Sequence, residues 1–129
     1  MGQASPFKPI ALVVEDDELQ SDLVATPLEE SEMGVIQCES AEEALRVLEK
    51  MGGSISLIFT DVALPGKIDG VELAHCAAQH YPNIHVIVTS GLRPMKDLPE
   101  GVMFMPKLST TTVSDGEIRE CSRFLCHEN

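Results

Sequence analysis

The chain has 129 residues, the usual size of one domain, and 43% of them are hydrophobic, which is enough for a core. Only 4% are aromatic and no Trp is present, so the core must be built from aliphatic side chains. The formal net charge of -12 argues against a nucleic-acid surface, which needs clustered Lys and Arg, and is compatible with a partner that carries basic patches.

The sequence also indicates in which cellular compartment the protein is expected. Its longest apolar runs are strand-sized, so we expect no membrane span, and residues 1–9 lack the apolar stretch of a signal peptide. The four cysteines show no C-x-x-C spacing, so we interpret them as thiols in a reducing compartment. We therefore expect a cytoplasmic protein with a flexible leader, residues 1–8, and one domain over residues 9–129.

Strands and helices are expected to alternate along the chain. In chain order, the expected elements are a strand at 10–14, a helix at about 17–31, a strand at 35–39, a helix at 41–51, a strand at 56–60, a helix from 69 to 81, strands at 84–89 and 102–105, and a last helix at about 112–125. Alternation with short connections predicts an α/β fold with a parallel sheet and right-handed crossovers. Near-continuous apolar strands suit a sheet that is covered on both faces.

Local signals set the expected helix ends. Gly34 is expected to end the first helix, and Gly52-Gly53 to stop the second. The run Ser40-Ala-Glu-Glu43 is typical of a capping box, in which each of the two polar side chains accepts a hydrogen bond from the other residue's backbone N–H. Asp69 is the expected N-cap of the third helix.

Prolines interrupt the pattern in two places. Pro27 lies inside the first helix, where its ring crowds the carbonyl four residues earlier, so we expect a kink or a split near residues 23–27. The segment 91–101 holds two prolines and two glycines in eleven residues, so we expect a mobile loop there instead of a full fourth helix.

Three carboxylates occupy the ends of two expected strands. Glu15 and Asp16 follow the first strand, and Asp61 follows the apolar run 56–60. The carboxyl ends of parallel strands meet at one edge of a sheet, where ligands bind. Three acidic groups at that edge repel one another unless a cation or a proton joins them. This arrangement predicts a Mg²⁺ site with an aspartate available as a nucleophile.

Five short motifs occur in order, each at the carboxyl end of a strand or at the start of the next helix. They are Val13-Val-Glu-Asp-Asp17, Phe59-Thr-Asp-Val-Ala-Leu-Pro-Gly66, Asp69-Gly-Val-Glu-Leu73, Val86-Ile-Val-Thr-Ser-Gly91 and Phe104-Met-Pro-Lys107. Over roughly residues 9–126 the chain resembles the receiver domain of bacterial two-component response regulators, of the stand-alone type. The resemblance implies a flavodoxin-like, doubly wound five-stranded parallel sheet in order 2-1-3-4-5, with three αβα layers and a short or missing fourth helix.

The resemblance implies that the acidic edge accepts a phosphoryl group. Asp61 would be the phosphoacceptor, and Glu15 and Asp16 would hold Mg²⁺ together with Asp61 and the backbone carbonyl of Ala63. Phosphoryl transfer depends mainly on positioning and on neutralising spread charge, and Mg²⁺ prefers oxygen ligands. These residue types therefore suit the implied chemistry.

Three further residues would complete the site. Thr89 would hydrogen-bond a phosphoryl oxygen, Lys107 would pair with the phosphoryl charge, and Phe104 would move inward with Thr89 on activation. The implied partners are a sensor histidine kinase or a histidine phosphotransfer protein and an unknown downstream protein, with no nucleic acid and no membrane. The domain would be a switch in a phosphorelay and not an enzyme, although it assists its own phosphorylation and dephosphorylation.

The chain departs from the receiver pattern after the lysine. In receivers a proline follows the lysine across a cis bond, whereas here Leu108 follows Lys107 and Pro106 precedes it. A cis bond before a residue other than proline costs about 2.5–4 kcal/mol. We therefore predict a trans Lys107–Leu108 bond.

Two alternative functions stay open. One is a degenerate receiver that binds a partner without phosphorylation, although the complete set of Asp61, Thr89, Lys107 and the two acids after the first strand argues against it. The other is a phosphatase or a flavin protein on a related sheet. Haloacid-dehalogenase-type phosphatases need D-x-D after the first strand and flavodoxin-like proteins need a Ser/Thr/Gly phosphate loop there, and Glu15-Asp-Asp17 supplies neither.

Overall fold

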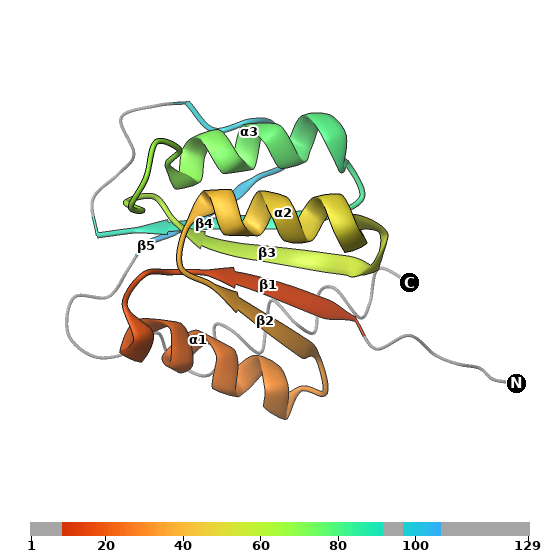
Figure 1. Ribbon diagram of the computed structural model, residues 1–129, viewed down its shortest axis with the longest axis vertical. Helices are drawn as coiled ribbons and strands as arrows, with labels where there is room; N and C mark the ends of the chain where they lie inside the picture. Colours follow the sequence, from red (N-terminus) through yellow and green to blue (C-terminus); the bar gives the residue numbers. More distant parts are fainter. Residues whose placement is uncertain (1–8, 92–96, 107–129) are drawn as a thin grey trace, which may run out of the picture.

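Five parallel strands form one sheet in the computed structural model, which describes residues 9–91 and 97–106 (Figure 1). Their order across the sheet is β2-β1-β3-β4-β5, as predicted. The strands are β1 (Ile10–Val14), β2 (Gly34–Cys38), β3 (Ile55–Asp61), β4 (His85–Ser90) and β5 (Met103–Pro106). The flavodoxin-like fold class is therefore confirmed, and the helix expected at 112–125 lies outside the described residues.

Within the described residues, three α-helices lie on the two faces of the sheet. Helix α1 (Glu18–Glu30) lies on one face, and α2 (Ala41–Met51) and α3 (Gly70–His80) lie together on the other (Figure 1). The apolar residues of β1 alternate between these two layers because successive side chains of a strand point to opposite faces. Ala11 and Val13 pack with the α1 side, whereas Leu12 and Val14 pack with the side of α2 and α3.

Helix α1 spans Glu18–Glu30, in agreement with the expected range of about 17–31, but Gly34 does not end it. Asp17 caps its start by accepting from the backbone N–H of Gln20 at 3.1 Å, and the last helical residue is Glu30. Glu32 then takes a left-handed backbone with φ of 68°, and Gly34 is the first residue of β2. The prediction that Gly34 ends the helix is therefore wrong, because the reversal of the chain is completed two residues before it.

Pro27 does not divide α1. The helix is continuous over Glu18–Glu30, although Pro27 has no N–H to donate to the carbonyl of Leu23 four residues earlier. The backbone N–H of Ser31 lies 3.1 Å from the carbonyl oxygens of both Pro27 and Leu28 and closes the turn. The predicted split is therefore wrong, while a kink at this position stays a prediction.

The N-terminal caps of α2 and α3 differ. The Ser40 hydroxyl accepts from the Glu43 N–H at 3.1 Å, but the Glu43 carboxylate accepts from the Glu39 N–H at 3.0 Å. The expected capping box at α2 is thus only half formed. Asp69 and Glu72 form the complete box at α3, with hydrogen bonds of 2.8 and 3.0 Å between each side chain and the other's backbone.

The described part of the β4–β5 connection contains no helix. Residues 97–102 lead into β5 without regular structure, and the Val102 N–H donates to the Pro99 carbonyl at 3.2 Å. The His75 ring lies 2.9 Å from the Asp97 carbonyl oxygen and links this connection to α3. No helix among the described residues is long and apolar enough to cross a membrane.

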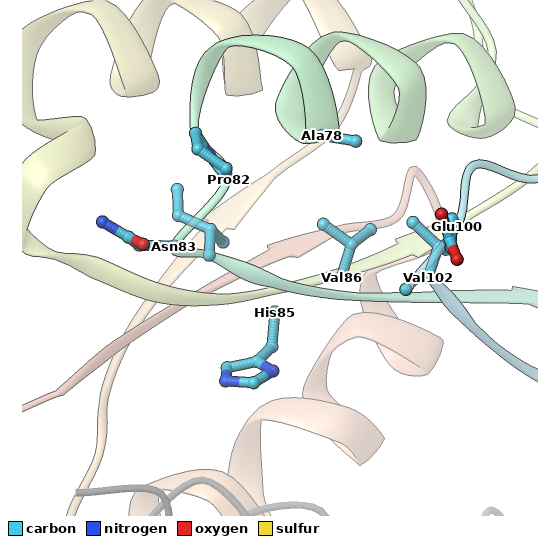
Figure 2. A pocket seen from close by; sticks show the side chains of 9 residues that line it. Ala78, Pro82, Asn83, His85, Val86, Glu100 and Val102 are labelled. Carbon is cyan, nitrogen blue, oxygen red and sulfur yellow. The ribbon is translucent and has the colours of Figure 1, made fainter.

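A hollow of about 400 Å³ lies between the end of α3, the start of β4 and residues 100–102 (Figure 2). Ala78, Val86 and Val102 extend into the space between α3 and β5, whereas the His85 side chain points to the opposite face of the sheet (Figure 2). The hollow includes the first residues of β4, so it lies at the other end of that strand from Thr89.

Candidate metal and phosphoacceptor site

Three carboxylates converge at the carboxyl ends of β1 and β3. Glu15, Asp16 and Asp61 each offer one oxygen, and these oxygens lie within 4.8 Å of one another. Asp61 is the last residue of β3, and Glu15 follows β1 directly. The structure therefore brings together the three acidic side chains that the sequence places at this edge.

Backbone hydrogen bonds fix the position of Glu15. Its N–H donates to the Cys38 carbonyl at 2.9 Å, which extends the pairing of β1 and β2 by one residue. Its carboxylate accepts from the Asp17 N–H at 3.1 Å. The end of β1 and the start of α1 therefore hold this side chain from both sides.

The cluster combines burial with like charge. Glu15 and Asp61 are each 8% exposed, whereas Asp16 is exposed. Like charges this close are costly where little water screens them, so a cation is favoured between them. Ligand oxygens about 2.1 Å from a six-coordinate Mg²⁺ lie about 3–4.2 Å from one another. The observed spacing of the carboxylates fits that ion with small adjustments of the side chains.

The chain after Asp61 is held close to the start of α3. The Val62 N–H donates to the Thr89 carbonyl at 3.0 Å, and the Gly70 N–H donates to the Val62 carbonyl at 2.9 Å. A Cβ at position 70 would overlap the Asp61 carbonyl oxygen, so only glycine allows this approach. Ala63, the expected carbonyl ligand, lies in this loop and is exposed.

Thr89 stands beside Asp61 in the sheet. The two are register partners on β3 and β4, and Thr89 is 3% exposed. Phe104 is half-buried on β5 and pairs with Val88, one residue before Thr89. Lys107 follows the last residue of β5, and both its placement and the Lys107–Leu108 bond lie outside the described residues.

Cys38 ends β2 opposite Val14, the residue before Glu15, and its chemistry argues for a structural role. The thiol is free and buried. Burial, and secondly the charge of Glu43, raise the pKa of the Cys38 thiol to about 11. A thiol with that pKa is protonated near neutral pH, which leaves the carboxylates as the nucleophiles of this edge.

Glu42 reaches the loop after Asp61 from α2. Its carboxylate accepts from the Lys67 backbone N–H at 2.9 Å. That N–H, and next its own backbone N–H, lower the pKa of the Glu42 carboxyl below its ordinary value. Nothing in the local pattern of α2 marks a contact with a residue 25 positions later, so the role of Glu42 is not evident from the sequence.

Comparisons with known proteins agree with this geometry. The family profile described as the response regulator receiver domain matches residues 11–104. An Arabidopsis thaliana protein named as a two-component response regulator, ARR21, is 32% identical over 108 residues. That match covers 81% of this chain but only 18% of the relative, so the chain spans a small part of that protein's length.

Solved structures share the fold. The signal receiver domain of an HD domain-containing protein from Pseudomonas fluorescens Pf-5 has a TM-score of 0.80 at 20% identity, covering 94% of this chain and 96% of that chain. A CheY-like receiver domain protein from Methanospirillum hungatei JF-1 gives 0.76 at 22% identity, covering 93% and 95%.

The receiver domain of the hybrid histidine kinase CckA gives a TM-score of 0.74 at 28% identity, covering 90% of this chain and 97% of that chain. Profile, relatives and structures all coincide over the part of the chain that carries the carboxylate cluster. The chain belongs to the family of response regulator receiver domains of two-component systems.

Proposed function

We propose that this receiver domain accepts a phosphoryl group on Asp61 and changes a partner-binding surface in response. The observation that carries the proposal is the convergence of Glu15, Asp16 and Asp61, with oxygens within 4.8 Å of one another, at the edge of the sheet where Thr89 also lies. Asp61 is the nucleophile because it ends the central strand β3 and is mostly buried beside the other two acids.

The proposed step is a phosphoryl transfer from a phosphohistidine. An Asp61 carboxylate oxygen forms a bond to phosphorus, the P–N bond to the donor imidazole breaks, and the imidazole nitrogen takes up a proton. Glu15, Asp16 and the Ala63 carbonyl would hold Mg²⁺ with Asp61, and a bound Mg²⁺ neutralises charge on the phosphoryl oxygens. Thr89 donates to a phosphoryl oxygen through its hydroxyl.

Lys107 completes the proposed set as the positive charge that pairs with the phosphoryl group. It follows β5, which lies next to β4 in the sheet. Phe104 lies on β5 opposite Val88, the residue before Thr89 on β4. In this proposal Phe104 and Thr89 respond jointly to phosphorylation. The proposal assigns the domain to residues 9–129, after a leader of residues 1–8.

The proposed partners follow from the family. Receiver domains take phosphoryl groups from histidine kinases or histidine phosphotransfer proteins, and one solved relative is the receiver domain of a hybrid histidine kinase.

The described cysteines, Cys38 and Cys76, are free thiols, which supports a reducing, cytoplasmic location. In this proposal the domain signals and is not itself an enzyme.

Intact-mass spectrometry after incubation with acetyl phosphate tests the proposal. We expect the protein to gain the mass of one phosphoryl group when Mg²⁺ is present and to gain none when EDTA replaces it. The Asp61→Asn variant should show no gain under either condition. A gain in the variant, or a gain independent of Mg²⁺, would contradict the assignment. No gain in the folded wild type would favour the degenerate receiver that acts without phosphorylation.

A further inference from the structure

The loop between β3 and α3 carries a carboxylate from another element. Glu42 of α2 accepts from the Lys67 N–H at 2.9 Å through Oε2, while its Oε1 is buried. Gly66, the residue before Lys67, has φ of +94°. A Cβ at position 66 would lie 2.7 Å from Glu42 Oε1, so the backbone of the loop closes directly onto the carboxylate.

This contact lies in the same loop as Ala63, the proposed carbonyl ligand. The base of the loop is held by the hydrogen bonds of Val62 with Thr89 and Gly70, and its far end by the cap at Asp69. Between these points, Leu64 and Ile68 pack against the core, and Glu42 holds the backbone at Lys67. A carbonyl binds a cation well only if its loop keeps one conformation when the ion arrives.

We infer that Glu42 is a positioning residue that keeps the loop of residues 62–69 in the conformation in which the Ala63 carbonyl can serve the metal site. The inference rests on the proposed function, since it concerns the same site. Glu42 acts through the Lys67 N–H, which its side chain must reach. The reach of the side chain and the presence of a hydrogen-bond acceptor therefore matter more than its charge.

Two conservative variants test the length and the charge of the Glu42 side chain separately. Glu42→Gln keeps the length and an acceptor oxygen but removes the charge, whereas Glu42→Asp keeps the charge but shortens the side chain by one methylene. We expect Glu42→Asp to weaken Mg²⁺ binding about tenfold, the effect typical of losing a group that orients metal ligands. We expect Glu42→Gln to stay within about threefold of the wild type, because its amide oxygen can still accept from Lys67.

The measurement is a calorimetric titration with Mg²⁺, accompanied by thermal unfolding of each metal-free variant. Glu49→Gln is the matched control, because Glu49 is an exposed acid of the same helix and its loss removes one charge. We expect the control to bind Mg²⁺ like the wild type. A purely structural role would lower the unfolding temperature and leave the Mg²⁺ affinity unchanged.

The outcomes distinguish this inference from the proposed function. If the wild type binds Mg²⁺ and Glu42→Asp binds it equally well, the inference is overturned and the proposed function stands. If Glu42→Gln loses more affinity than Glu42→Asp, charge is what matters and the positioning role is again wrong. If the wild type binds no Mg²⁺, both proposals fall.

Discussion

Glu15 and Asp16 are adjacent in the chain, yet their environments differ. Glu15 is buried and accepts from the Asp17 N–H, whereas Asp16 is exposed. The sequence could predict that both lie beside Asp61, because the carboxyl ends of parallel strands meet at one edge. It could not predict which one is buried, because that depends on how β2 and α1 close over the end of β1.

Removing both acids should abolish Mg²⁺ binding and raise the stability of the metal-free protein. Glu15→Ala with Asp16→Ala takes two like charges away from Asp61, and each such repulsion near 4 Å is worth about 1 kcal/mol in bulk water and more where water is excluded. Thermal unfolding with and without Mg²⁺ measures both effects. We expect Mg²⁺ at 100 times its Kd to stabilise the wild type by about 2.7 kcal/mol and the double variant not at all. Equal stabilisation of both would place the ion elsewhere.

Cys38 should make the protein lose stability in alkaline solution. Its folded pKa of about 11 lies above the ordinary thiol pKa of 9.0, so the unfolded chain releases the thiol proton first. The stability from this group is complete below pH 9.0 and is lost as the pH rises towards about 11. Urea unfolding between these pH values should show a shallower decline for Cys38→Ala than for the wild type. Parallel declines would show that the thiol does not contribute.

At the scale of elements, α1 presents an apolar surface beside the site. Leu19 is 69% and Leu23 is 39% exposed, and the two lie one turn apart on the helix that follows Glu15 and Asp16. Residues four apart on a helix are neighbours on its surface, so the two leucines form one small apolar patch, and we treat this patch as a candidate contact for a protein partner. In the proposed function, this patch lies where a protein phosphodonor could contact the domain.

Replacing both leucines with Ala should slow phosphorylation by a protein donor but not by acetyl phosphate. Burying each leucine in an interface is worth roughly 1.5 kcal/mol or more, so we expect at least a tenfold rise in KM for a phosphorylated histidine phosphotransfer protein. Met103→Ala, at another exposed apolar residue, is the control and should leave that KM unchanged. Unchanged kinetics in the leucine variant would exclude this face.

Local sequence patterns predict where the strands and helices lie but not every detail of how they begin and end. The strands and the three described helices lie where the hydrophobic pattern places them, because burial on one or both faces sets that pattern. The half-formed cap at Ser40 was not predictable, because the N–H of Glu39, one residue before the cap, takes the Glu43 carboxylate. The left-handed backbone of Glu32 was not predictable either, because glutamate is not a residue type that favours this conformation. The role of Glu42 was not evident from the sequence, since its partner Lys67 lies on a distant loop.

At the scale of the whole molecule, the sheet connects the site to the β4–β5 region. Asp61 pairs with Thr89, and β4 in turn pairs with β5, which carries Phe104. A change at Asp61 can therefore reach residues 97–106 through two neighbouring strands. Moving such a switch from mostly off to mostly on takes about 5.5 kcal/mol of differential stabilisation. In the proposed function, new contacts of the phosphoryl group with Thr89, Lys107 and Mg²⁺ supply it.

Hydrogen exchange tests this coupling. Binding of beryllium fluoride, a phosphoryl mimic, with Mg²⁺ should change the amide exchange of residues 97–105, while amides of β2, on the far side of β1, should change little. The Asp61→Asn variant serves as the control, because it should show no response to the mimic. Unchanged exchange at residues 97–105 in the wild type would make the domain a phosphate carrier and not a conformational switch.

The central claim is that Asp61 carries the phosphoryl group. Sodium borohydride reduces an aspartyl phosphate to homoserine, so peptide mapping after treatment with acetyl phosphate, Mg²⁺ and borohydride locates the modified residue directly. We predict homoserine at position 61 and no reduced side chain at any other Asp or Glu, with none at position 61 when Mg²⁺ is withheld. Homoserine at position 16, 5-hydroxynorvaline (the product expected from a glutamyl phosphate) at position 15, or no reduced residue in a protein that has gained the mass of a phosphoryl group would contradict the account.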